Sequence, residues 1–152
     1  MKSLGRAPDK AELVTRLGKL TPQSERRWGR MNAHQMVCHL ADNCRMALGQ
    51  KAVSDDTSLV KRTLIKWVAL YAPVQWRPGI VTRPDIDQQI AGTCPADFQS
   101  DVAEVKTLLD AVAHNHRGGR WPDHPVFGKM SSSQWLRWAY LHTDHHLRQF
   151  GV

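Results

Sequence analysis

One stretch in the second half of the chain restricts the fold more than any other feature. Its apolar residues repeat at intervals of four and three, a spacing that forms one stripe along a helix and interlocks with neighbouring helices. The stripe consists of Phe98, Val102, Val105, Leu109 and Val112. A helix with such a stripe must pack against other helices. We therefore expect the 152 residues to form one helical domain, residues 1–152.

Caps and stops predict four further helices. Capping-box spacings mark three helix starts, and the pairs are Asp9 with Glu12, Asn32 with Gln35, and Ser131 with Gln134. The predicted helices cover about Asp9–Leu20, Asn32–Gly49, Ser58–Ala72, and Ser131 or Ser132 to Gly151. The stripe helix should end within residues 114–119. Proline and glycine are frequent from Pro73 to Pro95, which predicts a long irregular connection.

The fold class follows from these helices and from the absence of alternating strand patterns. We predict an all-α four-helix bundle with a short additional helix, either N-terminal or in a connection. No stretch approaches the length of a membrane span, and the N-terminus has no apolar signal core. We therefore expect a soluble, cytoplasmic protein that does not enter a membrane.

Charge and cysteine content limit the function further. The net charge is +7, but the basic residues are scattered and form no DNA-reading motif. A solvated basic surface, or attraction of an anionic small molecule, explains this charge better than nucleic-acid binding. Three cysteines without a CxxC motif are expected to be reduced thiols.

Two histidines near the C-terminus suggest metal chemistry. His142 and His146 are four residues apart, which places their Cβ atoms about 5–6 Å apart on one helix face. They continue an apolar stripe with Trp135, Ala139 and Phe150. Two imidazoles in such a stripe need partners for four ring nitrogens, and a metal ion would bind one nitrogen of each. The alternative is that both are ordinary buried or half-exposed histidines held by hydrogen bonds.

A tetrahedral site needs ligands beyond this pair. His39, at the edge of the apolar stripe in the second predicted helix, is the best candidate for the third, although a single histidine there, taken alone, is more often a core or boundary residue. His145 is three residues from His142 and could replace His146, but it lies about 100° round the helix from that residue. The imidazole set would suit Zn²⁺, Ni²⁺ or Fe²⁺.

Several polar residues have weaker claims to a role. Asp42 and Asp144 could orient the imidazoles, or could be solvated helix residues. Arg148 and Gln149 could contact an acidic substrate or cap the helix end.

Candidates for lining a substrate pocket are Trp135 and Met36, together with Arg148 and Gln149. No catalytic residue can be assigned. The last helix lacks the HExxH motif, because Thr143 follows His142 and the helix holds no glutamate. A general base is therefore unidentified.

Three runs of sequence carry a family resemblance. They are WGRMNAHQMVCHLAD at 28–42, HPVFG at 124–128 and HTDHHLRQFG at 142–151. With these runs the chain resembles the DinB/YfiT-like superfamily, and more narrowly its uncharacterised bacterial branch, over nearly its whole length. The resemblance implies a four-helix bundle that holds a divalent metal through His39, His142 and His146. Several superfamily members resemble thiol S-transferases or isomerases that use bacillithiol, mycothiol or glutathione.

We accordingly expect a metal-dependent protein that acts on a small molecule. The first hypothesis is an enzyme of the thiol S-transferase type, in which the metal activates a thiol or water. The second is a non-catalytic helical module that binds a metal or ligand, or that dimerises. A homodimer is expected only by analogy.

Overall fold

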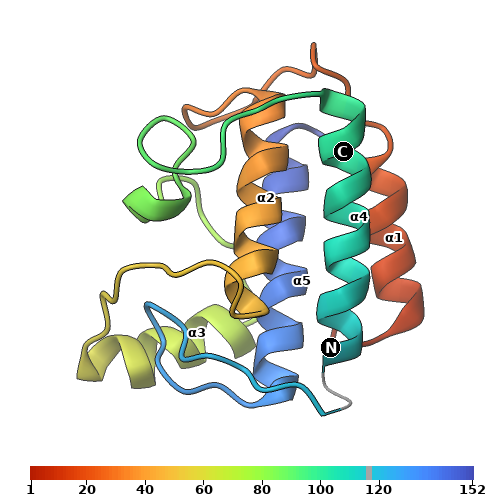
Figure 1. The fold of residues 1–152 in the computed structure, drawn as a ribbon. Helices are drawn as coiled ribbons and strands as arrows, with labels where there is room; N and C mark the ends of the chain where they lie inside the picture. Colours follow the sequence, from red (N-terminus) through yellow and green to blue (C-terminus); the bar gives the residue numbers. More distant parts are fainter. Residues whose placement is uncertain (116–117) are drawn as a thin grey trace.

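The structure is a computed structural model that describes residues 1–115 and 118–152. Its five α-helices are α1 (Ala7–Leu17), α2 (Ala33–Ala47), α3 (Lys66–Tyr71), α4 (Phe98–His114) and α5 (Ser132–Gln149) (Figure 1). A π-helical segment, η1 (Lys61–Ile65), precedes α3, and a 3₁₀ turn, η2 (Pro84–Ile86), follows it. The described ranges contain no strand, only an isolated bridge between His124 and Gly128. The prediction of an all-α fold is confirmed.

The four long helices pack side by side and form what we call the helical core, α1, α2, α4 and α5. Each contacts two others, because α2 packs on α4 and α5, and α1 packs on the same two helices from the other side. Helix α3 projects to one side of the helical core and contacts α5 (Figure 1). The η2 turn contacts α2. The seam between α2 and α5 is therefore flanked by α3 and η2.

Capping boxes start the two helices that form this seam. The Asn32 side chain accepts from the Gln35 backbone at 2.8 Å, and the Gln35 side chain accepts from the Asn32 backbone at 3.0 Å. Ser131 and Gln134 form the same pair of bonds at the start of α5. Both predicted capping boxes are confirmed, so the local sequence sets where these helices begin.

The first helix differs from its prediction. It begins at Ala7 with Pro8 in its first turn, and it ends at Leu17 rather than Leu20. Proline favours the first turn of a helix because its φ angle already suits that position and it has no N–H to satisfy. Asp9 is therefore inside the helix, where its carboxylate accepts the Ser3 backbone N–H at 2.9 Å. The prediction that Asp9 is the N-cap is wrong.

The third predicted helix, Ser58–Ala72, is not a regular α-helix. Its centre is the π-helical η1, and α3 covers only its last part. Of the apolar residues in this range, Leu59 and Trp67 are exposed and Leu70 is buried. The end of this segment, α3, contacts α5, whereas Leu59 and Leu64 earlier in the segment are exposed. The predicted irregular connection is confirmed apart from η2.

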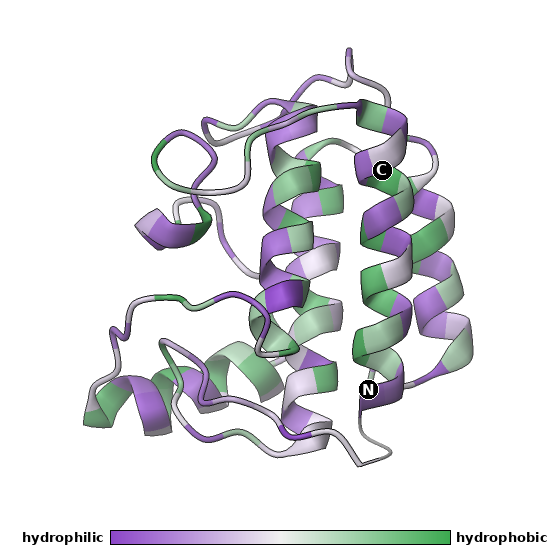
Figure 2. Ribbon diagram, in the orientation of Figure 1, coloured by the Kyte–Doolittle hydropathy of each residue, from purple (hydrophilic) through white to green (hydrophobic). Residues whose placement is uncertain are grey.

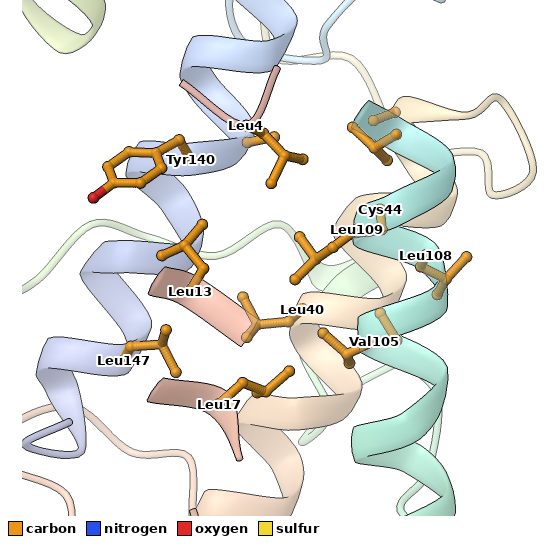
Figure 3. Packing of buried hydrophobic residues seen from close by; sticks show 14 of the residues in the cluster. Leu4, Leu13, Leu17, Leu40, Cys44, Val105, Leu108, Leu109, Tyr140 and Leu147 are labelled. Carbon is orange, nitrogen blue, oxygen red and sulfur yellow. The ribbon is translucent and has the colours of Figure 1, made fainter. Parts of the chain in front are cut away.

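The apolar stripe of α4 forms one wall of the core. All five stripe residues are buried, and Val105, Leu109 and Val112 are completely inaccessible. Figure 3 shows Leu109 and Val105 among apolar side chains from the other long helices, namely Leu13, Leu17, Leu40 and Leu147. Of the predicted stop at residues 114–119, helix α4 ends at His114, whereas His116 and Arg117 lie outside the described residues. No described helix is long and apolar enough to cross a membrane.

Candidate metal centre

Three imidazoles meet at the seam between α2 and α5. The Nε2 atoms of His39 and His142 are 3.3 Å apart, and the ring of His146 lies 4.7 Å from each of the other two rings. One ring nitrogen of each histidine lies within 4.8 Å of the others. Two nitrogens bound to one tetrahedral zinc at about 2.0–2.1 Å would be roughly 3.3 Å apart. The structure thus brings the three residues predicted as ligands to distances that suit one metal ion.

Outer hydrogen bonds determine which nitrogen of two of these histidines is free. His39 Nδ1 is 2.7 Å from the Ile86 carbonyl oxygen, which can only accept, so Nδ1 carries the proton. His146 Nδ1 is 2.8 Å from Gln149 Oε1, and Gln149 Nε2 donates to the Trp28 carbonyl at 2.8 Å. That second bond orients the amide so that its oxygen faces His146. Both histidines therefore present an Nε2 lone pair to the centre, the form that binds metal.

The lone pair of His39 has competing partners when no metal is bound. Asn43 Nδ2 donates to the His39 backbone carbonyl at 2.7 Å and lies 3.1 Å from His39 Nε2. His142 Nε2 can donate to the same atom at 3.3 Å. The indole of Trp138 stacks on the other side of His142, with ring centres 4.9 Å apart. A cation at the centre would replace these contacts to His39 Nε2, which are long for hydrogen bonds.

Burial keeps all three imidazoles uncharged. Removal from water lowers the pKa of His39, and it lowers the pKa values of His142 and His146 well below their usual range. The neighbouring imidazoles lower the pKa values of His142 and His146 further, since positive charges would repel one another. Neutral imidazole is the metal-binding form, so no proton has to be displaced from these rings at neutral pH.

A glycine allows the loop before α2 to approach Gln149. Gly29 has a φ of +81°, and a Cβ atom there would lie 2.5 Å from Gln149 Nε2. Any larger residue would push away the amide that positions His146. The Trp28–Gly29 pair thus acts on the site through Gln149, a connection that the sequence alone did not reveal.

His145 lies beside the centre but outside the group of converging nitrogens. Its ring is 5.2 Å from that of His146 and lies between the indoles of Trp28 and Trp76, at 5.9 and 6.1 Å. Burial, and then Arg148, lower its pKa, while a hydrogen bond with the Trp76 backbone raises it. The structure therefore favours His146 over His145 as the third imidazole.

Asp42 does not orient an imidazole, contrary to prediction. Its fully buried carboxylate accepts from the Thr93 backbone at 2.8 Å, from the Thr93 hydroxyl at 2.6 Å and from the Gln88 amide at 2.9 Å. Arg45 also donates to it, at 3.1 Å. Asp42 instead ties the segment after η2 to α2. Directly before this segment, η2 ends at Ile86, whose backbone carbonyl orients His39 instead.

Asp144 likewise forms its side-chain bonds with arginines rather than with the three histidines. It accepts from Arg16 at 2.7 Å and from Arg148 at 2.9 Å, and Arg148 also donates to Gln75 at 3.3 Å. These bonds hold α5 to α1 and to the connection after α3. The predicted orienting role of Asp144 is therefore wrong.

The predicted pocket lining was also wrong. Trp135 and Met36 are completely buried in the helical core. Arg148 is held by Asp144, and Gln149 is held by His146 and the loop before α2. None of these four residues lines the cavity that reaches the histidines. Trp135 and Met36 face the interior of the helical core, whereas the cavity lies on its outer side.

A cavity of about 590 Å³ opens onto the three imidazoles. Its outer side is formed by residues 59–83, which we call the outer wall and which include η1, α3 and part of the following connection. The loop at 124–127 closes another side. Apolar lining residues are Ile65, Val68, Val74, Ile80, Val126 and Phe127. The sequence signal for this wall is a run of apolar residues whose spacing does not place them on one buried helix face. Figure 2 shows the apolar character of α3.

His124 is a further lining residue that the metal-ligand reasoning did not assign. Its Nδ1 accepts the backbone N–H groups of Val126 at 3.1 Å and Phe127 at 3.2 Å, so Nε2 carries the proton. That Nε2 is buried and has no partner among the described residues. Burial, with a smaller effect of Lys66, lowers the pKa of His124 to about 3. It is a neutral histidine that shapes the 124–128 turn.

Comparison with known proteins gave one match. A family model described as a protein of unknown function (DUF1569) matches residues 3–151. No curated protein and no solved structure matched the chain. The resemblance to the DinB/YfiT-like superfamily stays a prediction. Because the match covers nearly the whole sequence, the chain belongs to the DUF1569 family, whose function is unknown.

Proposed function

We propose that this protein binds one divalent metal ion through His39, His142 and His146 and presents it to a small molecule in the adjoining cavity. One observation carries the proposal. Three imidazoles converge, of which those of His39 and His146 are buried and that of His142 is half-buried, and outer hydrogen bonds orient two of them so that Nε2 lone pairs face the same point. Such converging lone pairs are otherwise costly in a buried site.

The residues around the site have separate roles. The Ile86 carbonyl and Gln149 hold the rings of His39 and His146, and the Trp138 indole covers one face of His142. No carboxylate is among the three converging groups, so the charge of Zn²⁺, Ni²⁺ or Fe²⁺ would not be neutralised. A bound metal of this kind supplies a Lewis-acid position that lowers the pKa of a thiol or water ligand. The apolar cavity walls limit access of bulk water.

The reaction we propose is transfer of a low-molecular-weight thiol, such as bacillithiol, mycothiol or glutathione, to a small electrophile. The thiol gives up its proton to solvent, its sulfur forms a bond to the electrophilic carbon, and the leaving group on that carbon, such as chloride, departs. Two features support it. The four long helices contact one another in a closed ring, as a four-helix bundle of DinB/YfiT type would. The histidines lie on α2 and α5, where the resemblance places metal ligands. We also propose a cytoplasmic location, which suits the three free cysteines.

A second candidate is a non-catalytic protein that binds a metal and a ligand. The observation in its favour is that no Asp or Glu is among the described residues lining the cavity. A proton transfer would then depend on the histidines or on the substrates themselves. Turnover distinguishes the two candidates.

Metal content measured by mass spectrometry on untagged protein tests the site. Wild-type protein should hold close to one divalent metal per chain. The His142→Ala/His146→Ala and His39→Ala variants should lose it, with affinity falling by more than the roughly 10–100-fold that loss of an outer partner costs. His114→Ala, at the exposed end of α4, is the matched control and should retain the metal.

Turnover is tested on the metal-loaded protein. A panel of thiols is incubated with 1-chloro-2,4-dinitrobenzene, and thiol consumption is followed with wild type and with His39→Ala. Metal-dependent consumption by wild type alone supports the transferase. Stoichiometric metal without consumption favours the binding protein. Wild type that is metal-free and takes up neither Zn²⁺ nor Ni²⁺ overturns the proposal.

A further inference from the structure

We propose that the cavity takes an uncharged, largely apolar small molecule whose one polar group faces the three histidines. The statement about the polar group rests on the proposed metal function. The statement about the body of the ligand rests on the cavity walls alone.

The walls are apolar on three sides. Ile65 and Val68 come from the helical part of the outer wall, Ile80 from the connection, and Val126 and Phe127 from the 124–127 loop. The volume, about 590 Å³, lies within the range typical of small-molecule sites. A ligand of this size would place most of its surface against hydrocarbon, which favours apolar groups.

Among the described residues, few charged side chains line the cavity, and one of its two arginines is already paired. No Asp or Glu is among the described lining residues, and its cations are Arg77 and Arg83. Arg83 lies 3.3 Å from Asp56 and donates to Ser54 at 2.8 Å. Arg77 is exposed. A charged group in the cavity body would lose its water without gaining a charged partner there, at a large cost in free energy.

The outer wall also exposes apolar side chains that a folded protein normally buries. All the described large apolar residues that are exposed, except Met1 and Ile90, lie between residues 59 and 81. Exposed apolar surface gathered in one place marks a binding site. The cavity continues from this surface to His39, which is only 2% exposed. A small molecule can enter to that depth, whereas the flat surface of a partner protein cannot.

This inference sharpens the proposed reaction. Low-molecular-weight thiols such as glutathione carry several charged groups, which the cavity body does not accommodate. The apolar electrophile would therefore occupy the cavity body. The charged part of a thiol would stay at the solvent side, where Arg77 is exposed.

A pair of fluorescent probes tests the inference. N-phenyl-1-naphthylamine is neutral, and 8-anilino-1-naphthalenesulfonate has the same ring skeleton with an added sulfonate. We expect wild-type protein to bind the neutral probe at least about tenfold more tightly. Tighter or equal binding of the sulfonate would overturn the proposal.

Matched substitutions locate the probe. Val68→Asp places a charge in the cavity, and Val60→Asp makes the same change at an exposed residue of the same helical segment that does not line it. The first should weaken binding of the neutral probe at least about tenfold, and the second by less than about twofold. Ile80→Asp, in the exposed connection, repeats the cavity change in case Val68→Asp unfolds. Equal losses in the Val60 and cavity variants would overturn the proposal.

The same measurement on His142→Ala/His146→Ala separates this inference from the metal. The walls remain in that variant, so the neutral probe should still bind. If wild-type protein binds no metal but binds the neutral probe, the apolar ligand class stands without the metal. If it binds metal but neither probe, the ligand class is wrong and the metal site stands.

Discussion

The helical core and the outer wall use the same kind of residue in opposite ways. In the helical core, Val105, Leu109 and Val112 are completely buried in a cluster to which α1, α2 and α5 also contribute. In the outer wall, Leu64 is 59% exposed and Val81 is 89% exposed. The core residues stabilise the fold. The exposed wall residues contribute little to it, and several of them, including Val81, line the cavity in front of the histidines.

A few anchors hold the outer wall to the helical core. Leu70 is completely buried, and Arg137 of α5 donates to its backbone carbonyl at 3.0 Å. Within the wall itself, Trp76 donates to the Ala69 carbonyl at 2.8 Å, which holds the following connection against α3. Few buried contacts imply a low free energy of local opening. We therefore expect the outer wall to open locally at lower cost than a core helix.

The largest expected effect compares two leucines. Leu109→Ala should lower the free energy of unfolding by about 2–5 kcal/mol, because it leaves a cavity in the core. Leu64→Ala, with most of its side chain in water, should change it by less than about 0.5 kcal/mol. Urea unfolding of both variants measures the difference. A comparable loss at Leu64 would mean that the outer wall is covered in solution, for instance by a second copy of the chain.

The second prediction concerns Asp42, which holds Gln88 and Thr93 of the connection before α4 against α2. Asp42→Asn keeps the shape of the side chain but removes the charge that accepts from Thr93 and Gln88, so unfolding should cost about 1–3 kcal/mol less. Amide exchange should also quicken in residues 84–93.

Asp144→Asn is the matched control for that change. Asp144 is about one-fifth exposed and pairs with Arg16 and Arg148, so its loss should cost less than about 1 kcal/mol. Equal effects of the two substitutions would show that Asp42 does not hold the connection.

The third prediction tests how the helical core positions the site. Gln149→Leu removes the acceptor of His146 Nδ1 and should weaken metal binding about 10–100-fold while leaving one metal per chain at saturation. A competition titration with a chromophoric chelator measures the affinity. Gln89→Leu, at an exposed residue of the connection, should leave the affinity unchanged. An unchanged affinity in Gln149→Leu would exclude the orienting role.

The helices that carry the site could be predicted from local sequence. Asn32 and Ser131 start α2 and α5 through bonds to residues three positions on, so short-range spacing contains the information. The pairing of His142 with His146 on one helix face was also predictable from helix periodicity, whereas His39 came from a bundle argument and from the family resemblance.

The parts of the site that depend on distant backbone were not predictable. The Ile86 carbonyl orients His39 from 47 residues away, and no side-chain pattern identifies a backbone acceptor. Gln149 depends on the Trp28 carbonyl and on Gly29, which lie at the other end of the chain. The outer wall could not be predicted for a different reason. Its apolar residues face a cavity or solvent, so they need not follow the period of a packed helix.

The last prediction concerns His124, which lies in the loop that closes the cavity. Its pKa in the folded protein is lowered to about 3 by burial, against about 6.5 in an unfolded chain. The unfolded state therefore binds this proton more readily at acidic pH. Stability due to neutral His124 is present above about pH 6.5 and is lost as the pH falls towards 3, by up to about 1.4 kcal/mol per pH unit.

His124→Asn isolates that contribution, because an asparagine oxygen can still accept the backbone N–H groups of Val126 and Phe127. We expect the free energy of unfolding of metal-free protein, measured in urea between pH 6 and pH 4, to fall less steeply in the variant, by up to about 1.4 kcal/mol per pH unit. His114→Asn, at the exposed end of α4, controls for the loss of a histidine as such. Parallel slopes in wild type and His124→Asn would show that water reaches this histidine through the cavity. The 124–127 loop would then resemble the outer wall in its access to water rather than the helical core.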